Sequence, residues 1–341
     1  MAILFATHEA YLDHLTGPRH PERPERLGAV IDGSRDAGVV DALVPLAPRA
    51  AEPHQLSRVH TRDHLAGVES LVRQGGGRLD PDTVASSGSW TAALLAAGAG
   101  LAAVDALIEG RADAAFCAVR PPGHHATRAH AMGFCLLSNV AVVAAELAER
   151  GERVAIVDFD AHHGNGTQDV FYRDPRVLYV SLHQWPLYPG TGWFEEIGED
   201  AGRGTTLNIP MPPGTSGAMY EYALEQLVVP ICQQFRPTWL IASAGFDGHR
   251  NDPITDLGLS SGDFSSITKT LCGLVPSGRR LVMLEGGYDL DALRMSTAAC
   301  IGALAGRDIR PELPTTAHSS AAIDMIDRIR RFWIESELLT V

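Results

Sequence analysis

The segment VDFDAHHGNGTQ, residues 157–168, is dense in side chains that bind metals or move protons. It begins as an apolar strand pattern and ends in a glycine-containing loop, so Asp160 and His162 can point toward one place where the strand gives way to the loop. A carboxylate and an imidazole are typical zinc ligands, and Asp247 is a candidate third ligand that would leave a fourth position open for water or substrate. Each residue alone is more often a helix cap or a buried polar group. The prediction of a metal site therefore depends on the cluster.

A second candidate group is RPPGHH, residues 120–125, in which two prolines and a glycine produce a stiff turn. Consecutive side chains of an extended chain point in opposite directions, so His124 and His125 can serve one site only if this turn bends the chain. Imidazoles titrate near neutral pH and suit general acid–base work. Asp158 and Asn165 are candidate orienting partners. A carboxylate raises imidazole basicity more than an amide does, so the two histidines need not share a role.

The segment LEGGYDL, residues 284–290, supplies a candidate hydroxyl donor. Gly286 and Gly287 let the backbone bend, so that Tyr288 could turn into the same crevice. A tyrosine after a strand is more often a packing residue. Beside a metal, however, a phenol can donate a hydrogen bond to an oxyanion, and the loss of one such donor typically lowers turnover by ~10²–10³.

The elements that must position these residues alternate between strand-like and helix-like patterns. Near-continuous apolar segments typical of buried parallel strands occupy residues 112–119, 153–160, 176–183, 238–247 and 280–288. Helical periodicity occupies residues 89–110, 139–151 and 219–235. The pattern predicts one α/β domain over residues 1–341, with an open, mostly parallel sheet covered by helices on both faces. The candidate residues follow strands, and ligands of such sheets bind at the carboxyl ends of the strands.

Composition excludes several other classes of protein. The chain has 341 residues, a net charge of -13 and no basic stripe, which argues against nucleic-acid binding. No apolar run reaches the ~18 residues of a membrane span, because Asp105 and Glu109 interrupt the richest stretch. The N-terminus lacks a basic signal-peptide region, and the five cysteines form no C-x-x-C pair. We therefore expect a cytoplasmic protein without disulfides or membrane contact.

Seven motifs occur in the order seen in the zinc-dependent histone deacetylases and their bacterial amidohydrolase relatives: RPPGHH, GFC (133–135), DFDAHHGNGTQ (158–168), SLH (181–183), PGTG (189–192), SAGFD (243–247) and LEGGY. The chain resembles this family over most of its length. Asn165, where many class I members carry Asp, together with the following GTQ, resembles the class II branch. The resemblance implies an arginase/deacetylase-like fold with its active site at the carboxyl ends of the strands.

The resemblance also implies roles for the candidate residues. Zinc would be held by Asp160, His162 and Asp247. His124 would pair with Asp158, and His125 with Asn165, with His125 as general base and then acid and His124 mainly electrostatic. Tyr288 would polarise the scissile carbonyl; because some class II members carry His there, its presence predicts a competent deacetylase.

Family members also bind potassium near the zinc and hold the substrate in a narrow channel. The matching potassium ligands are the main-chain oxygens of Asp158, Asp160, His162 and Leu182 with the Ser181 hydroxyl, and a second site matches Phe171, Asp174 and Val177. The matching channel residues are Gly133, Phe134 and Tyr188. Arg26 matches an arginine near the cavity through which acetate leaves, the alternative being a surface arginine. His163 has no implied role at the metal and is interpreted as structural.

The expected function is removal of acetyl from N-acetyl-lysine in peptides or proteins, by metal-assisted amide hydrolysis. The first alternative is a deacetylase of acetylpolyamines or of another small acetylated amine. Polyamine-preferring class IIb relatives carry Glu after DP, where this chain has Ile254. A second alternative, an inactive binding module, would have lost a ligand or Tyr288, and neither is lost. Fe²⁺ or Co²⁺ could occupy the same ligands as Zn²⁺, and a homo-oligomer is compatible with the sequence.

Overall fold

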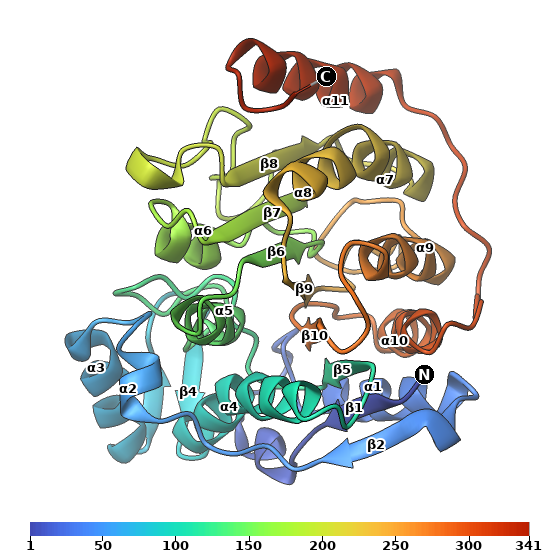
Figure 1. Cartoon of the computed structure of the whole chain (residues 1–341). Coiled ribbons are helices and arrows are strands. Elements are labelled where there is room, and N and C mark those ends of the chain that lie inside the picture. Colours follow the sequence, from blue (N-terminus) through green and yellow to red (C-terminus); the bar gives the residue numbers. More distant parts are fainter. Residues whose placement is uncertain (341) are drawn as a thin grey trace.

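The computed structural model describes residues 1–340 and is built around an eight-stranded sheet (Figure 1). The spatial order is β2-β1-β5-β10-β9-β6-β7-β8, and every pairing is parallel. The strands are β1 (Ile3–Ala6), β2 (Leu43–Leu46), β5 (Ala114–Cys117), β6 (Val154–Asp158), β7 (Val177–Gln184), β8 (Thr206–Met211), β9 (Trp239–Ala244) and β10 (Arg280–Leu284). The prediction of a parallel α/β sheet is confirmed.

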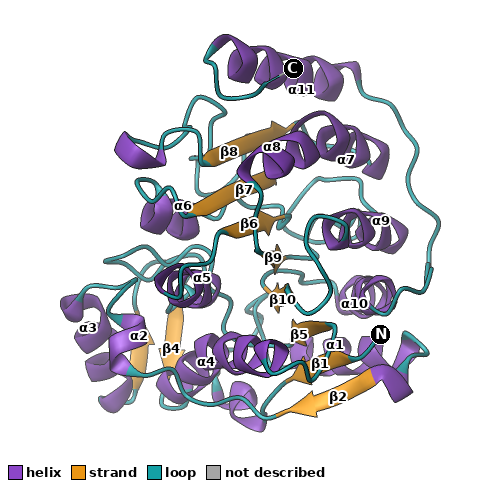
Figure 2. Ribbon diagram, viewed as in Figure 1, coloured by secondary structure: helices purple, strands orange, loops and turns teal. Residues whose placement is uncertain are grey.

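Helices pack against both faces of this sheet (Figure 2). One face is covered by α4 (Ser89–Ile108), α5 (Asn139–Glu149) and α6 (Asn165–Phe171). The other face is covered by α1 (Glu25–Asp36), α10 (Leu290–Leu304), α9 (Ser261–Cys272), α7 (Gly217–Ala223) and α8 (Val229–Phe235). The helix α11 (Ser320–Glu335) packs beside β8, and α2 (Pro53–Leu56), α3 (Arg62–Arg73) and the small β3 (Gly76–Arg78) and β4 (Val84–Ser86) pair lie beyond α4.

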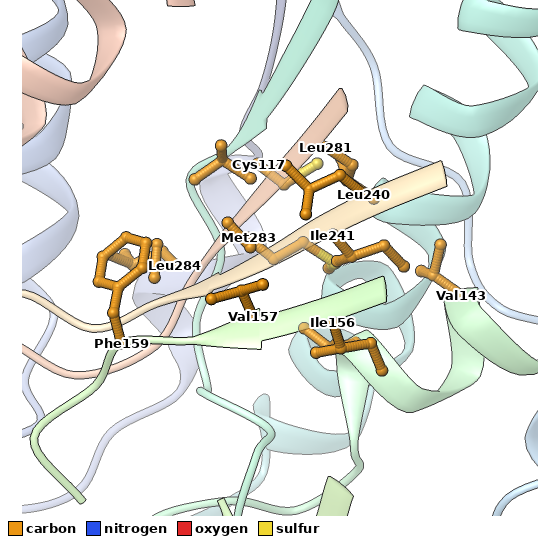
Figure 3. Close-up of a cluster of buried hydrophobic side chains, with 14 of the residues drawn as sticks. Cys117, Val143, Ile156, Val157, Phe159, Leu240, Ile241, Leu281, Met283 and Leu284 are labelled. Carbon is orange, nitrogen blue, oxygen red and sulfur yellow. The ribbon is translucent and has the colours of Figure 1, made fainter. Parts of the chain in front are cut away.

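The central strands are buried on both faces, as their near-continuous apolar sequences predict. All residues of β5, β6 and β9 are buried. Figure 3 shows the resulting cluster, in which Val157 of β6, Ile241 of β9 and Met283 of β10 lie with Val143 of α5. Burial of one such aliphatic side chain contributes about 1.5–3 kcal/mol, so this cluster fixes the strands whose ends carry the polar residues.

The long helix α4 overturns the expectation that no segment is apolar enough to span a membrane. Its 20 residues are long and apolar enough to do so by length and composition. In the structure, 67% of its most apolar window is buried inside the protein. Small residues such as Ala96, Gly100 and Ala103 let α4 pack closely on the sheet and on α5. This burial is typical of a core helix.

Candidate active site

The predicted metal ligands meet at the carboxyl ends of β6 and β9. Asp160 follows β6 by two residues, and Asp247 follows β9 by three. The His162 Nδ1 atom lies 3.1 Å from Asp160 Oδ1 and 2.9 Å from Asp247 Oδ2. One ligand atom from each of the three buried residues lies within 4.8 Å of the others. One imidazole and two carboxylates at this spacing fit a catalytic metal site with three protein ligands.

Backbone amides hold the two carboxylates in place. The Ala161 amide donates to Asp247 Oδ1 at 2.8 Å, and the Gly286 amide donates to Asp160 Oδ2 at 2.8 Å. A Cβ atom at Gly286 would lie 2.3 Å from Asp247 Oδ2, which no side chain could accommodate without displacing the ligand. A glycine is therefore required at position 286 so that the backbone can approach the Asp247 carboxylate this closely, whether or not the chain also bends there.

The two consecutive histidines reach the same site from the loop after β5. His124 Nδ1 lies 3.0 Å from Asp158 Oδ2, and His125 Nδ1 lies 2.8 Å from Asn165 Oδ1. Burial alone would lower the pKa of His124, but Asp160 and Asp158 raise it well above its ordinary value. Burial, with His124 and His162 nearby, holds the pKa of His125 well below its ordinary value. One imidazole therefore favours the charged form and its neighbour the neutral form.

We predicted no role for Glu285, which positions the loop that carries His124 and His125. Its Oε2 atom accepts the backbone amides of Gly123 at 2.6 Å and His124 at 3.1 Å, and Ser243 donates to its Oε1 at 2.9 Å. Burial raises the pKa of this carboxyl to about 7. The available signal was an acidic residue at the end of an apolar strand, because a buried carboxyl needs hydrogen-bond partners.

A cavity of about 220 Å³ reaches His162, one of the three candidate metal ligands. It is lined by Asp82, His125, Gly133, Phe134, His162, Leu187, Tyr188, Ile254 and Tyr288. The three predicted channel residues are thus present together with Tyr288. The ring of Phe134 packs edge-on against Tyr288 with centroids 5.8 Å apart. Burial raises the pKa of the Tyr288 hydroxyl well above its ordinary value, so the phenol stays a hydrogen-bond donor at neutral pH.

Comparison with known proteins identifies the family. Residues 20–304 match the model of the histone deacetylase domain. The chain belongs to the histone deacetylase family. It is 41% identical over 309 residues to a "Probable deacetylase" of Archaeoglobus fulgidus, covering 89% of this chain and 86% of that protein. It is 39% identical to a "Histone deacetylase-like amidohydrolase" of Pseudomonas aeruginosa, covering 84% of this chain and 76% of that protein.

One plant relative and one solved structure are also similar to this chain. "Histone deacetylase 15" of Arabidopsis thaliana is 39% identical over 92% of this chain, which spans 59% of that protein. The solved "Crystal Structure of HDA15 HD domain" matches with a TM-score of 0.91 and 36% identity, covering 99% of this chain and 96% of that one. The arginase/deacetylase-like fold implied by the motifs is thereby confirmed.

Three of the five residues expected to bind potassium lie on the neighbouring strands β6 and β7, and the other two, Asp160 and His162, follow β6. Asp158 of β6 is paired in register with Ser181 of β7. The Ser181 hydroxyl lies 2.9 Å from His183 Nδ1, and the Leu182 carbonyl accepts the Tyr220 hydroxyl at 3.3 Å. The second set, Phe171, Asp174 and Val177, lies in the turn from α6 into β7.

His163, next to His162 in the loop after β6, is not part of the cluster of candidate metal ligands and pairs with other side chains. Its Nδ1 atom is 2.8 Å from the Thr191 hydroxyl, and its Nε2 atom is 3.0 Å from Gln168 Oε1. Burial lowers its pKa to about 3. A neutral imidazole with a partner at each ring nitrogen links the loop after β6 to the PGTG segment.

Arg26 is fully buried, which excludes the surface alternative. Its guanidinium donates to the carbonyls of Gly287 at 2.6 Å and Glu285 at 2.5 Å and lies 5.0 Å from the centroid of the Tyr288 ring. It pairs with buried Glu22, 3.1 Å away, and Glu22 also pairs with buried Arg120. This network braces the chain segment that carries Tyr288.

Replacement of Glu22 by glutamine should destabilise the protein most strongly near neutral pH. The loss of one partner of a buried ion pair typically costs about 3–5 kcal/mol. Burial alone would raise the pKa of Glu22, but Arg120 and His14 hold it well below its ordinary value. The ionised carboxylate therefore stabilises the fold above its unfolded pKa of about 4.3, and this contribution is lost as the pH falls toward the folded value. Urea unfolding at pH 7 and pH 3 measures the difference.

The exposed Glu25, in the first turn of α1, is a matched control for this change. Glu25→Gln should leave the free energy of unfolding within about 0.5 kcal/mol of wild type at both pH values. A Glu22→Gln penalty that stayed constant or grew between pH 7 and pH 3 would contradict the assignment of an ionised Glu22.

Proposed function

We propose that the protein is a zinc-dependent deacetylase that hydrolyses N-acetyl-lysine side chains of peptides or proteins. The observation that carries the proposal is where the cluster of Asp160, His162 and Asp247 lies. One member of the cluster, His162, lines the same small cavity as His125 and Tyr288. Relatives named as deacetylases or amidohydrolases support hydrolysis of an acetyl amide. The cavity's small volume suits a single extended side chain rather than a bulky ligand.

Asp160, His162 and Asp247 would hold the metal, and their mixed oxygen and nitrogen donors fit Zn²⁺. When bound, zinc supplies Lewis acidity, which polarises the scissile carbonyl and lowers the pKa of water toward ~7. Fe²⁺ and Co²⁺ accept the same donors, so metal analysis of the purified protein belongs with the activity test.

The two histidines would divide the proton transfers. His125, which is oriented by the neutral Asn165 amide, would accept a proton from the attacking water at its Nε2 atom and return it to the departing lysine nitrogen. His124, which is paired with the Asp158 carboxylate, would stay protonated and stabilise negative charge that develops beside it. The different partners of the two imidazoles support this division.

The cavity walls would bind and orient the substrate. Phe134 and Tyr188 would hold the aliphatic stem of the acyl-lysine, and Leu187 and Ile254 add apolar surface that excludes water. Tyr288 would donate its hydroxyl to the carbonyl oxygen as this oxygen gains negative charge. Tyr188 is 37% exposed and therefore lies at the mouth, where the substrate backbone would remain outside.

A rate comparison on three substrate classes tests the proposal. We expect kcat/KM to be highest for acetyl-lysine peptides, lower for acetylated polyamines, and lower again for small anilide amides. Dialysis against a strong chelator should abolish the activity, and added Zn²⁺ should restore it. A polyamine preference would favour the alternative substrate, and activity that survives metal removal would refute the zinc mechanism.

Ile254 offers a test of substrate choice within the same cavity. Ile254→Glu should raise the ratio of acetylpolyamine to acetyl-lysine kcat/KM by about 10-fold or more, because a carboxylate in the wall attracts a substrate cation. Ile254→Gln, of similar size but uncharged, is the control and should leave the ratio nearly unchanged. Equal ratios for both variants would mean that this position does not set the preference.

We further propose that potassium occupies the site beside β6 and β7, and that the protein acts in the cytoplasm. All five cysteines are free thiols, which is compatible with a reducing compartment. Activity measured in potassium and in tetramethylammonium buffers at equal ionic strength tests the first proposal, and fractionation of the source cell tests the second.

A further inference from the structure

The loop after the metal ligand Asp247 contains a buried carboxylate, Asp252, whose two oxygens bind different parts of the chain. Its Oδ2 atom accepts the backbone amide of Tyr288 at 2.7 Å. Its Oδ1 atom accepts the backbone amide of Ile254 at 3.1 Å. The side chain is 7% exposed, so water does not compete freely for either oxygen.

Both residues held by Asp252 line the substrate cavity. Ile254 belongs to the loop after β9, whereas Tyr288 belongs to the segment after β10, so one carboxylate joins two walls of the cavity. Arg26 holds the same segment from its other side through the Gly287 carbonyl.

The Tyr288 segment needs such an external anchor. Gly286 and Gly287 precede Tyr288 directly, and Gly287 has a φ of 116°, so the local chain imposes little constraint of its own. Misplacement of a reacting group by about 1 Å can lower turnover by ~10²-fold. A buried carboxylate that accepts a hydrogen bond from the Tyr288 amide fixes the backbone position from which the Tyr288 side chain extends.

We propose that Asp252 is a positioning residue that couples the catalytic Tyr288 to the channel wall at Ile254. It keeps the Tyr288 hydroxyl, which donates to the oxyanion, aligned with the wall that contacts the aliphatic stem of the substrate. This inference rests on the proposed deacetylase function. Both oxygens are required, because an amide in the same place has one acceptor oxygen and would turn an NH₂ group toward the second backbone amide. A neutral side chain of the same shape therefore cannot replace it.

The test compares Asp252→Asn with Asp263→Asn in the full chain. Asp263 is also buried, and its two oxygens also accept backbone amides, from Ser260 at 2.7 Å and Thr315 at 2.9 Å, but it lies on α9 and does not line the cavity. Asp252→Asn should lower kcat for an acetyl-lysine peptide by about 10-fold or more with metal content unchanged. Asp263→Asn should lower the melting temperature while kcat stays within about 2-fold of wild type.

The same substitution in a Tyr288→Phe background separates positioning from general destabilisation. If Asp252 acts through the Tyr288 hydroxyl, Asp252→Asn should cost less than about 2-fold once that hydroxyl is absent, because residues that act as a unit are not additive. The same fold-loss in both backgrounds, or an equal kcat loss in Asp263→Asn, would overturn the inference.

Hydrogen–deuterium exchange gives a readout that does not depend on activity. In Asp252→Asn the segments around Tyr288 and Ile254 should exchange faster, whereas Asp263→Asn should change the segments around Ser260 and Thr315 instead. Unchanged exchange at Tyr288 would overturn the inference even if the proposed substrate proved wrong. If the wild type hydrolysed none of the acetyl amides, the proposed function would be refuted. Hydrogen–deuterium exchange would then still decide whether Asp252 positions Tyr288.

Discussion

Asp247→Ala should lose its metal and, with it, all measurable hydrolysis. The change removes one of the three proposed ligands and would leave only Asp160 and His162 to hold the metal. Even the loss of a partner that only orients a ligand typically weakens metal binding 10–100-fold, and the loss of a ligand is more severe. Metal analysis of the purified variant, together with kcat/KM on an acetyl-lysine peptide, measures both effects.

The control for this change lies on the same loop. Asp256 is exposed, and the contact of its carboxylate with Gln184 is long, at 3.5 Å, so Asp256→Ala should keep stoichiometric metal and near-normal turnover. Asp247→Asn serves as a second variant if the alanine form is unstable. Stoichiometric metal in a folded Asp247→Ala protein would show that Asp247 is not the third ligand.

Tyr288→Phe should reduce kcat by ~10²–10³ while metal content and folding stay intact. The change removes only the hydroxyl, and the remaining ring keeps its packing against Phe134 and its position beneath the Arg26 guanidinium. The three proposed metal ligands are untouched, so the defect should appear in kcat rather than in metal affinity. Steady-state kinetics with metal analysis tests this expectation.

A second tyrosine to phenylalanine change provides the comparison. Tyr222 on α7 donates to Asp327 of α11 at 2.8 Å, away from the cavity. Tyr222→Phe should lower stability by about 1 kcal/mol and leave kcat unchanged. A near-normal rate for Tyr288→Phe would remove its hydroxyl from the mechanism.

The central strands of the fold could be predicted from sequence, but the edge strands could not. Strands β5, β6, β7, β9 and β10 coincide with the apolar segments, because strands buried on both faces have near-continuous apolar sequences. The outermost strands β2 and β8 contain Pro45 and Pro210, and proline obscures a strand pattern. Edge strands tolerate it because one side needs no ladder hydrogen bonds.

The site was predictable wherever a residue type itself indicates chemistry. Asp160, His162 and Asp247 stand out because carboxylates and imidazoles bind metals, and the structure brings them together. Glu285 and Asp252 were missed because their partners are backbone amides of distant segments. An amide has no sequence signature, so such contacts become visible only when the sheet brings the strand ends together.

The position of these strands in the sheet also determines how the protein should respond to heat. The candidate catalytic and metal-binding residues follow β5, β10, β9 and β6, and each of these strands is paired on both sides. Strands in the middle of a sheet generally open only when the whole molecule unfolds, whereas edges fray earlier. Thermal inactivation should therefore coincide with the global melting transition instead of preceding it. At moderately raised temperature the site should stay intact while the backbone amides of the edge strands exchange with solvent.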